Sequence, residues 1–309
     1  MEAIKNVLVG LDLSEMDDTL IKFAALVADS SEANKVTFVN IIKNLDIPDE
    51  VLKEFPDLKK NALKEREDQL RSKVNLHFKP KSDVKAEFMV KAGRGAKSIL
   101  ELSGKLDIDL IVIGRKITLP GDGVLATRLA RRASCNLLII PEGKELKISK
   151  FLIPIDFSMH SELAVNKAVE IADRYEGEIE ITAQNVYSVP AGYHYSGKSY
   201  EEFADVMKKH AEKDYTKFMK KIDTKGIKIN PIYNLDINDN LISDINDLAN
   251  VIHPDCIIIG AKGRTATTAI FLGSFAEKLI TTDMKYPLMI VRPKGKNSGF
   301  IDYFKEISK

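Results

Sequence analysis

The chain of 309 residues carries one pattern twice, in the same order along each half. The first matched segment in each half is an apolar run that ends in Asp-x-Ser, and the later matches are apolar runs followed by glycine or proline. The matched pairs are 7–14 with 151–158, 109–114 with 255–260, and 137–141 with 288–291. A repeat that keeps its order indicates a duplicated domain, so the fold must be one that a half-chain can form.

Within each half, short β-branched runs alternate with segments of helical period, as in Ile21, Ala24, Ala25 and Ala28. The predicted strands are roughly 6–12, 36–42, 84–90, 109–114 and 136–141, then 150–156, 178–186, 227–234, 256–260 and 287–292. Continuously apolar strands that alternate with helices predict a parallel sheet covered on both faces. The fold class is therefore α/β, with two tandem doubly wound five-stranded parallel-sheet domains.

The predicted domains are residues 1–145 and 146–309, separated by a short polar link at 143–148. The spacing of Ser14 and Asp17 predicts a capping box at the start of the first helix.

Composition removes several function classes. Lys and Arg number 46 against 45 Asp and Glu, so there is no broad basic field for nucleic acid. No apolar run approaches the ~20 residues that cross a bilayer, which predicts no membrane span. The N-terminus lacks the features of a secretion signal. Cys135 and Cys256 are predicted to be reduced packing residues, and the protein is predicted to be cytoplasmic.

A glycine pattern follows the predicted fourth strand of the second half. Gly260 and Gly263 are followed, after nine residues, by Gly273 and Ser274 at the start of a helix. Glycines let backbone N–H groups approach an anion, and a helix N-terminus adds further donors and a favourable dipole. Ligands in open parallel sheets lie beyond the carboxyl ends of the strands, where Asp156 also falls. Two structural roles stay open: the glycines as simple turns, and Asp156 as a helix cap.

These residues make the second half resemble the universal stress proteins, whose ATP-binding members carry Gly-x2-Gly-x9-Gly-Ser/Thr at this place. The resemblance covers nearly the whole chain as two family-sized copies. It implies that ATP is bound with Asp156 as the polar anchor at the ribose, and with Val186 contacting adenine through its backbone. The nucleotide-binding set that it implies is Pro154, Asp156, Val186, Ile259, Gly260, Gly263, Gly273, Ser274 and Phe275.

The first half departs from this motif. Gly114 is retained, but Ile117 stands at the second glycine, and the loop is one residue shorter before Ala126 and Thr127. A β-branched residue resists positive φ and crowds the approach to the backbone. Asp12 is kept, so this half is predicted to be nucleotide-free or to bind something smaller.

No catalytic residue and no protein metal ligand is predicted. Mg²⁺ is expected on the ATP phosphates, where phosphate oxygens and water hold it. Lys262 and Arg264 could reach the phosphates or remain solvated loop charges. His160 and His194 follow strand ends of the second half, so they could border the pocket or form an adventitious metal site.

The resemblance implies an ATP-binding regulatory protein of the stress response. It also implies that the fifth strands of the two halves pair within the chain, and a homodimer is a further possibility. A slow ATPase or adenine-nucleotide hydrolase is the enzyme alternative, and an interaction scaffold with a vestigial glycine loop is the other. The protein partners and the stress are not encoded in any motif.

Overall fold

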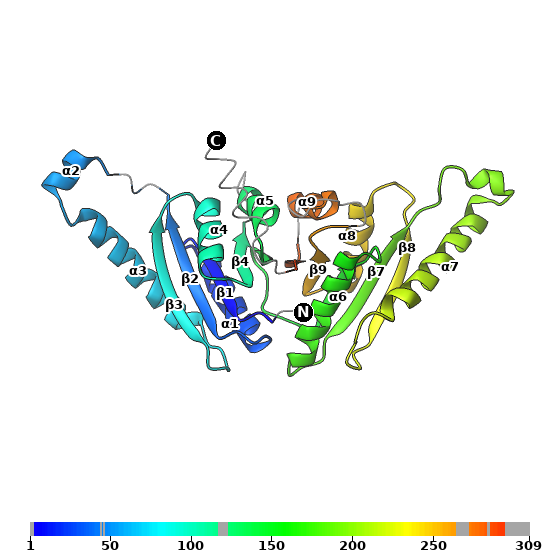
Figure 1. The fold of residues 1–309 in the computed structure, drawn as a ribbon, viewed down its shortest axis with the longest axis horizontal. Helices are drawn as coiled ribbons and strands as arrows, with labels where there is room; N and C mark the ends of the chain where they lie inside the picture. Colours follow the sequence, from blue (N-terminus) through cyan, green and yellow to red (C-terminus); the bar gives the residue numbers. More distant parts are fainter. Residues whose placement is uncertain are drawn as a thin grey trace. The chain divides into compact units, whose positions relative to one another are not determined.

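The computed structural model describes residues 3–43, 45, 47–116, 123–263, 272–282 and 285–293. The described chain divides into two compact units, residues 3–146 and residues 147–292. Figure 1 shows that each unit is a twisted sheet with helices on both of its faces. No described helix is long and apolar enough to cross a membrane.

The first unit contains a five-stranded parallel sheet in the order β3-β2-β1-β4-β5. Helices α1 and α3 pack together on the sheet, and α4 and α5 form a second packed pair. Its elements are β1 (Asn6–Leu11), α1 (Met16–Asp29), β2 (Lys35–Ile42), α2 (Asp49–Glu54), α3 (Leu58–His77), β3 (Lys85–Ala92), α4 (Gly95–Lys105), β4 (Leu110–Arg115), α5 (Gly123–Arg132) and β5 (Asn136–Pro141).

The second unit repeats this arrangement with the order β10-β9-β6-β7-β8, again parallel throughout. Helix α6 packs on β6, β9 and β10, and α8 packs on α9. Its elements are β6 (Lys150–Pro154), α6 (Met159–Arg174), β7 (Glu180–Tyr187), η1 (Tyr193–Ser196), α7 (Tyr200–Met219), β8 (Ile229–Leu235), α8 (Leu241–Ile252), β9 (Cys256–Gly260), α9 (Ser274–Thr281) and β10 (Leu288–Val291).

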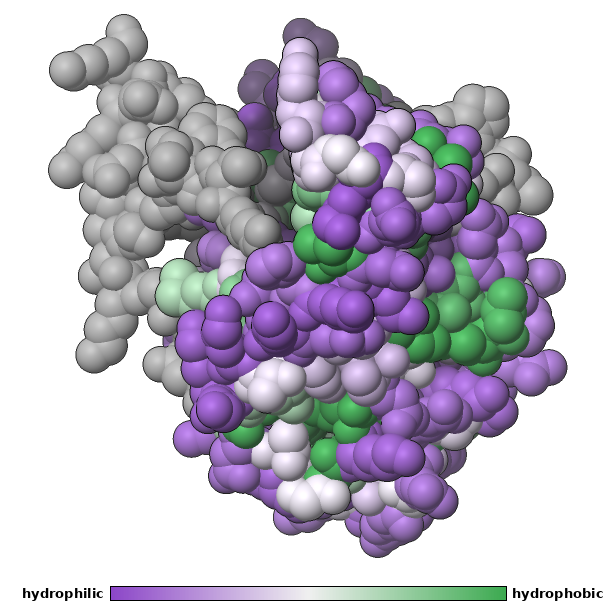
Figure 2. All heavy atoms as spheres, turned by 90° about the vertical axis from the view of Figure 1, so that its right-hand side faces the viewer, coloured by the Kyte–Doolittle hydropathy of each residue, from purple (hydrophilic) through white to green (hydrophobic). Residues whose placement is uncertain are grey.

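The predicted fold class is confirmed, and each predicted strand is present with ends that move by up to two residues. The strands are apolar along their whole length because helices cover both faces: Ile111, Val112 and Ile113 of β4 are at most 1% exposed. The outer helices are polar toward solvent. Figure 2 shows the face that carries α7 and β8, where hydrophilic side chains predominate around smaller apolar areas.

Each unit has the same polar contacts at its central strand, β1 or β6. Asp109 accepts hydrogen bonds from the amides of Lys5 and Asn6, and Asp255 accepts them from the amides at the start of β6. The Asn40 side-chain amide donates to the carbonyl of Leu11, the last residue of β1, and the Asn185 side-chain amide donates to the carbonyl of Ile155, directly after β6, at 2.9 Å in both cases. These contacts hold both ends of β1 and of β6, the strands that lead into Asp12 and Asp156.

The predicted capping box at Ser14 and Asp17 is wrong. Helix α1 begins at Met16 with no side-chain cap, and the Asp17 carboxylate instead accepts from the amides of Asp12 and Leu13. The Asp17 side chain bonds to the loop that precedes the helix because Leu13 adopts φ +65°, which turns two amides of the β1–α1 loop toward the carboxylate. A leucine in this region costs about 1–2 kcal/mol, and the hydrogen bonds to Asp17 offset that cost.

Candidate functional site

The candidate site lies at the carboxyl end of β6, where the strand order of the second unit reverses. Strand β6 is hydrogen-bonded to β9 on one side and to β7 on the other. After Pro154 ends the strand, the Ile155 amide donates to the Gln184 carbonyl at 2.8 Å, so Asp156 is the first residue beyond the sheet. This is the place where open parallel sheets bind ligands.

The Asp156 carboxylate has two different environments. Its Oδ1 accepts hydrogen bonds from the Ser158 amide at 3.1 Å and from the Ser161 hydroxyl at 2.6 Å. Its Oδ2 lies 3.0 Å from the point that a Cβ on Gly263 would occupy. Helix α6 is capped by Ser158, whose hydroxyl accepts from the Ser161 amide, so the helix-capping alternative for Asp156 is wrong. One oxygen fixes the loop and the other faces the glycine turn.

The glycine turn after β9 is held close to α6. A Cβ on Gly260 would lie 2.7 Å from the Cβ of His160 and would also overlap the His160 carbonyl. Helix packing alone therefore requires glycine at this position. Neither Gly260 nor Gly263 has a positive φ. A side chain at 263 would therefore meet no backbone strain, but its Cβ would lie in tight contact with the Asp156 carboxylate, which favours glycine there.

The start of α9 approaches the same turn. The Gly273 amide donates to the Ala261 carbonyl at 2.9 Å, and a Cβ on Gly273 would stand 3.2 Å from Lys262 Cα. Ser274 opens the helix, and no side chain caps it among the described residues. Its first amides are the orphan donors that a helix N-terminus offers to an anion.

Charged side chains gather around His160 near this strand end. Burial lowers the pKa of His160, and the positive charges of Lys262 and Arg292 lower it further, against the opposing effect of Asp156. Burial also lowers the pKa of Lys262, and Arg292 adds to that shift. These lowered pKa values indicate that His160, Lys262 and Arg292 lie close together, so an anion placed among them would be stabilised.

The other predicted site residues fall at different depths. Ser274 is exposed, and Val186 and Phe275 are half-buried. Ile259 is 1% exposed within β9, so its side chain belongs to the core. The structure brings Asp156 together with the glycines at 260, 263 and 273, whereas no described contact joins Val186 to them. Residues 264–271, including Arg264, lie outside the described residues, as do Ile117 and residues 294–309.

The first unit is built differently at the equivalent place. Lys116, which follows Gly114 as Lys262 follows Gly260, forms an ion pair of 2.7 Å with Asp12 Oδ2. Burial pushes the pKa of Asp12 upward, but hydrogen bonds from Lys116 and Ser14 outweigh burial and hold the pKa below its usual value. The carboxylate corresponding to Asp156 is thus already neutralised by its own chain.

The position of His160 is taken by Met16 in the first unit. Its sulfur lies 2.7 Å from where a Cβ on Gly114 would stand. The next residue is Asp17, and burial raises the pKa of its carboxyl to about 6. Hydrogen bonds from two amides lower this pKa, and the charge of Asp12 raises it. An apolar thioether and a second carboxylate therefore replace the histidine and serine of the second unit.

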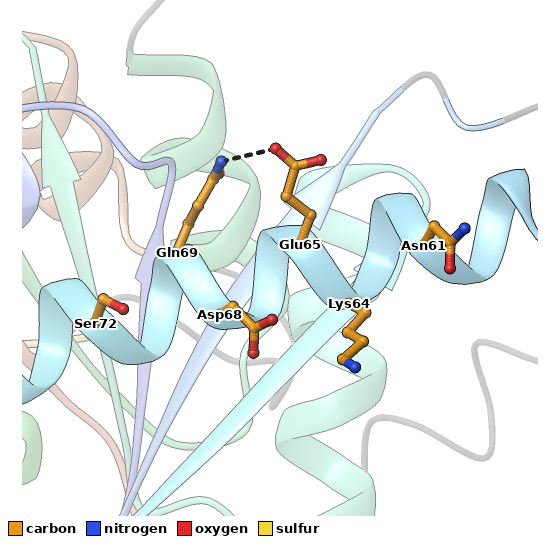
Figure 3. Close-up of a pocket in the computed structure, with 6 residues that line it drawn as sticks. All are labelled: Asn61, Lys64, Glu65, Asp68, Gln69 and Ser72. Atoms are coloured by element: carbon orange, nitrogen blue, oxygen red, sulfur yellow. Dashed lines mark hydrogen bonds between the residues drawn. The ribbon is translucent and has the colours of Figure 1, made fainter.

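A separate hollow runs along α3 of the first unit. Its lining residues all come from that one helix, and Gln69 donates to Glu65 at 3.3 Å (Figure 3). They are Asn61, Lys64, Glu65, Asp68, Gln69 and Ser72. No second element supplies converging groups to this surface, so we place the candidate site at the strand ends of the second unit.

Comparison with known proteins fits this duplicated α/β architecture. The pattern of the Universal stress protein family matches residues 3–141 and, a second time, residues 147–292. The chain belongs to the universal stress protein family. The resemblance inferred from the motifs is therefore confirmed, as is its tandem form.

Related proteins match single halves or the whole chain. Universal stress protein MJ0577 of Methanocaldococcus jannaschii is 30% identical over 159 residues, covering 47% of this chain and 96% of that protein. Universal stress protein MJ0531 of the same organism is 28% identical over 156 residues, with coverages of 50% and 89%. A solved universal stress protein from Archaeoglobus fulgidus shares 14% identity with a TM-score of 0.60, over 93% of this chain and 96% of its own. The last similarity shows the fold alone.

Sequence reasoning missed two members of the site. Ser161 ties Asp156 to α6, and Arg292 adds charge from the end of β10. The repeat offset that places Asp12 on Asp156 also places Asp17 on Ser161, so aligning the halves residue by residue would have drawn attention to Ser161. Arg292 has no counterpart motif, and only the fold brings it near His160.

Proposed function

We propose that the second domain binds one ATP as a regulatory ligand and that the protein acts in stress adaptation through ATP-dependent changes in its interactions. The supporting observation is that the glycine turn, the uncapped start of α9 and Asp156 converge at the switch point of one sheet. The ATP-binding set is that implied by the family motif: Pro154, Asp156, Val186, Ile259, Gly260, Gly263, Gly273, Ser274 and Phe275.

Each group has a chemical task in this proposal. The Asp156 Oδ2 accepts from the ribose hydroxyls, while Oδ1 stays bound to the loop and holds the carboxylate in place. The amides of the turn and of the start of α9 donate to the phosphate oxygens. Lys262 adds positive charge beside them. Mg²⁺ is held by phosphate oxygens and water, which needs no ligand from the chain.

We expect no equivalent cradle in the first domain. Its Asp12 is engaged by Lys116, so a ribose hydroxyl would have to compete with an ion pair. We therefore expect a single ATP site in each chain, with the first domain serving the interactions of the protein. Pairing of the fifth strands within the chain, homodimerisation and a cytoplasmic location stay predictions.

The equivalent aspartates provide a matched test. ATP affinity is measured by calorimetry on Asp156→Ala and, as the control, on Asp12→Ala. Loss of the ribose contact should weaken binding about tenfold to a hundredfold, the range expected when one partner of a hydrogen bond to a charged group is lost. Asp12→Ala should bind as the wild type does. Equal affinities for all three proteins would refute the assignment of the ribose anchor.

The alternatives give different results in the same sample. Turnover of ATP that disappears in Lys262→Ala while binding persists would identify the protein as a hydrolase. A wild-type protein without affinity for ATP would favour the nucleotide-independent scaffold.

A further inference from the structure

His160 stands out as a polar group that the proposed ATP contacts do not use. It is the second residue of α6, and its backbone and Cβ press against Gly260 at the start of the glycine turn. Its ring nitrogen Nδ1 is buried and has no hydrogen-bond partner among the described residues. A buried imidazole nitrogen without a partner is costly, so a histidine here needs a reason beyond packing.

Three charged side chains from different elements act on His160. Asp156 lies on the loop before α6, Lys262 on the turn after β9, and Arg292 directly after β10. The two cations and burial disfavour a third positive charge, whereas Asp156 favours it. The positive form of the imidazole is therefore disfavoured by a balance that a bound anion would change.

We propose that His160 takes up a proton when a polyphosphate binds, so that the second domain binds nucleotide more tightly as the pH falls. This inference rests on the proposed ATP site, and it names a regulation of that site. A polyphosphate at the glycine turn would screen Lys262 and Arg292 from His160 and would add negative charge beside the ring. Both effects favour the imidazolium.

The first domain supports this interpretation by contrast. The position equivalent to His160 is Met16, whose sulfur and terminal methyl lie beside Gly114, so the first domain has no titrating group at this position. In the second domain the backbone and Cβ of His160 make the contact with Gly260, so this contact does not depend on the imidazole ring. His160→Met introduces the residue found at the equivalent position of the first domain, and it removes the titrating imidazole.

The size of the effect follows from linkage. A rise of one unit in the His160 pKa on binding corresponds to a tenfold difference in affinity between pH values above and below both pKa values. For each unit of that rise, the protonated form of His160 should bind ATP about tenfold more tightly than the neutral form. A one-unit rise corresponds to an uptake of about half a proton per binding event midway between the two pKa values.

The experiment titrates the histidines of the full chain by NMR, without ligand and with saturating ATP. The His160 signal is assigned by its loss in His160→Met, and His77 of the first domain is the internal control. The expected result is an upward shift of the His160 midpoint with ATP and an unchanged His77 midpoint. Calorimetry at pH 5.5 and pH 8 then compares the wild type with His160→Met, because protonation of ATP itself affects both proteins alike.

The outcomes separate the two claims. ATP binding with an unmoved His160 midpoint, or with the same pH dependence in both proteins, overturns the proton coupling and leaves the ATP site standing. Absence of ATP binding at every pH overturns the proposed function and the coupling with it.

Discussion

Asp17 gives the sharpest test of how the first domain is built. Its carboxylate is 1% exposed and binds two loop amides, and burial raises its pKa from 3.8 to about 6. A shift of roughly two units corresponds to about 3 kcal/mol of unfolding free energy. Because the pKa is higher in the folded state, this stability is fully present below pH 3.8 and is lost as the pH rises through 6.

The perturbation is Asp17→Asn, which removes the titration and keeps an oxygen acceptor. Between pH 4 and pH 7 the wild-type first domain should lose up to about 3 kcal/mol relative to the variant. Denaturant-dependent hydrogen exchange of the β1 amides measures this domain separately, since the two domains need not unfold together. If the unfolding free energies of wild type and variant changed with pH in parallel over this range, the buried Asp17 charge would not destabilise the first domain and the reasoning would be wrong.

Two further results follow from the geometry. Gly260→Ala should destabilise the second domain by about 1–3 kcal/mol, because its methyl group would overlap the start of α6. The control Gly95→Ala meets no atom within 4 Å and should be neutral or slightly stabilising in the same exchange measurement. Lys116→Met should raise the pKa of Asp12 toward its usual value, because the hydrogen bond and charge of Lys116 lower it. A carboxyl carbon NMR titration measures that shift, and an unmoved midpoint would contradict the ion pair.

The repeat and the apolar periodicity were enough to predict the fold. Strands that are apolar throughout, such as β4, leave few alternatives to a parallel sheet covered on both faces. The end of a strand is harder to predict. The predicted strand ran to residue 156, but β6 ends at Pro154, and Asp156 bonds to Ser158 and Ser161 instead.

Side-chain contacts across loops were the part that the sequence did not predict. Ser14 and Asp17 have the spacing of a capping box, yet Asp17 bonds backward to the loop because Leu13 adopts a left-handed conformation. A pattern of residue types carries no signal for a non-glycine residue with positive φ. Similarly, Lys116 and Asp12 are 104 residues apart, and only the sheet brings them together.

For the glycines of the second domain, the sequence predicted their placement but not the contacts that they make. Their spacing predicted that 260, 263 and 273 would lie together, and the amide of Gly273 bonded to Ala261 places them so. The structure adds reasons that the spacing did not predict, since a Cβ on Gly260 would overlap the start of α6 and a Cβ on Gly263 would crowd Asp156. The approach of an anion to these glycines stays a prediction.

We propose that each chain has one ATP site and that this site belongs to the second domain. The most direct measurement is the number of ATP molecules bound per chain of wild-type protein, by calorimetry with Mg²⁺ and repeated on Gly273→Val. One ATP per chain, lost in the variant, is the predicted result. Two ATP molecules per chain would show that the Lys116–Asp12 ion pair does not prevent binding to the first domain. A wild-type protein that binds no ATP would contradict the ATP site itself.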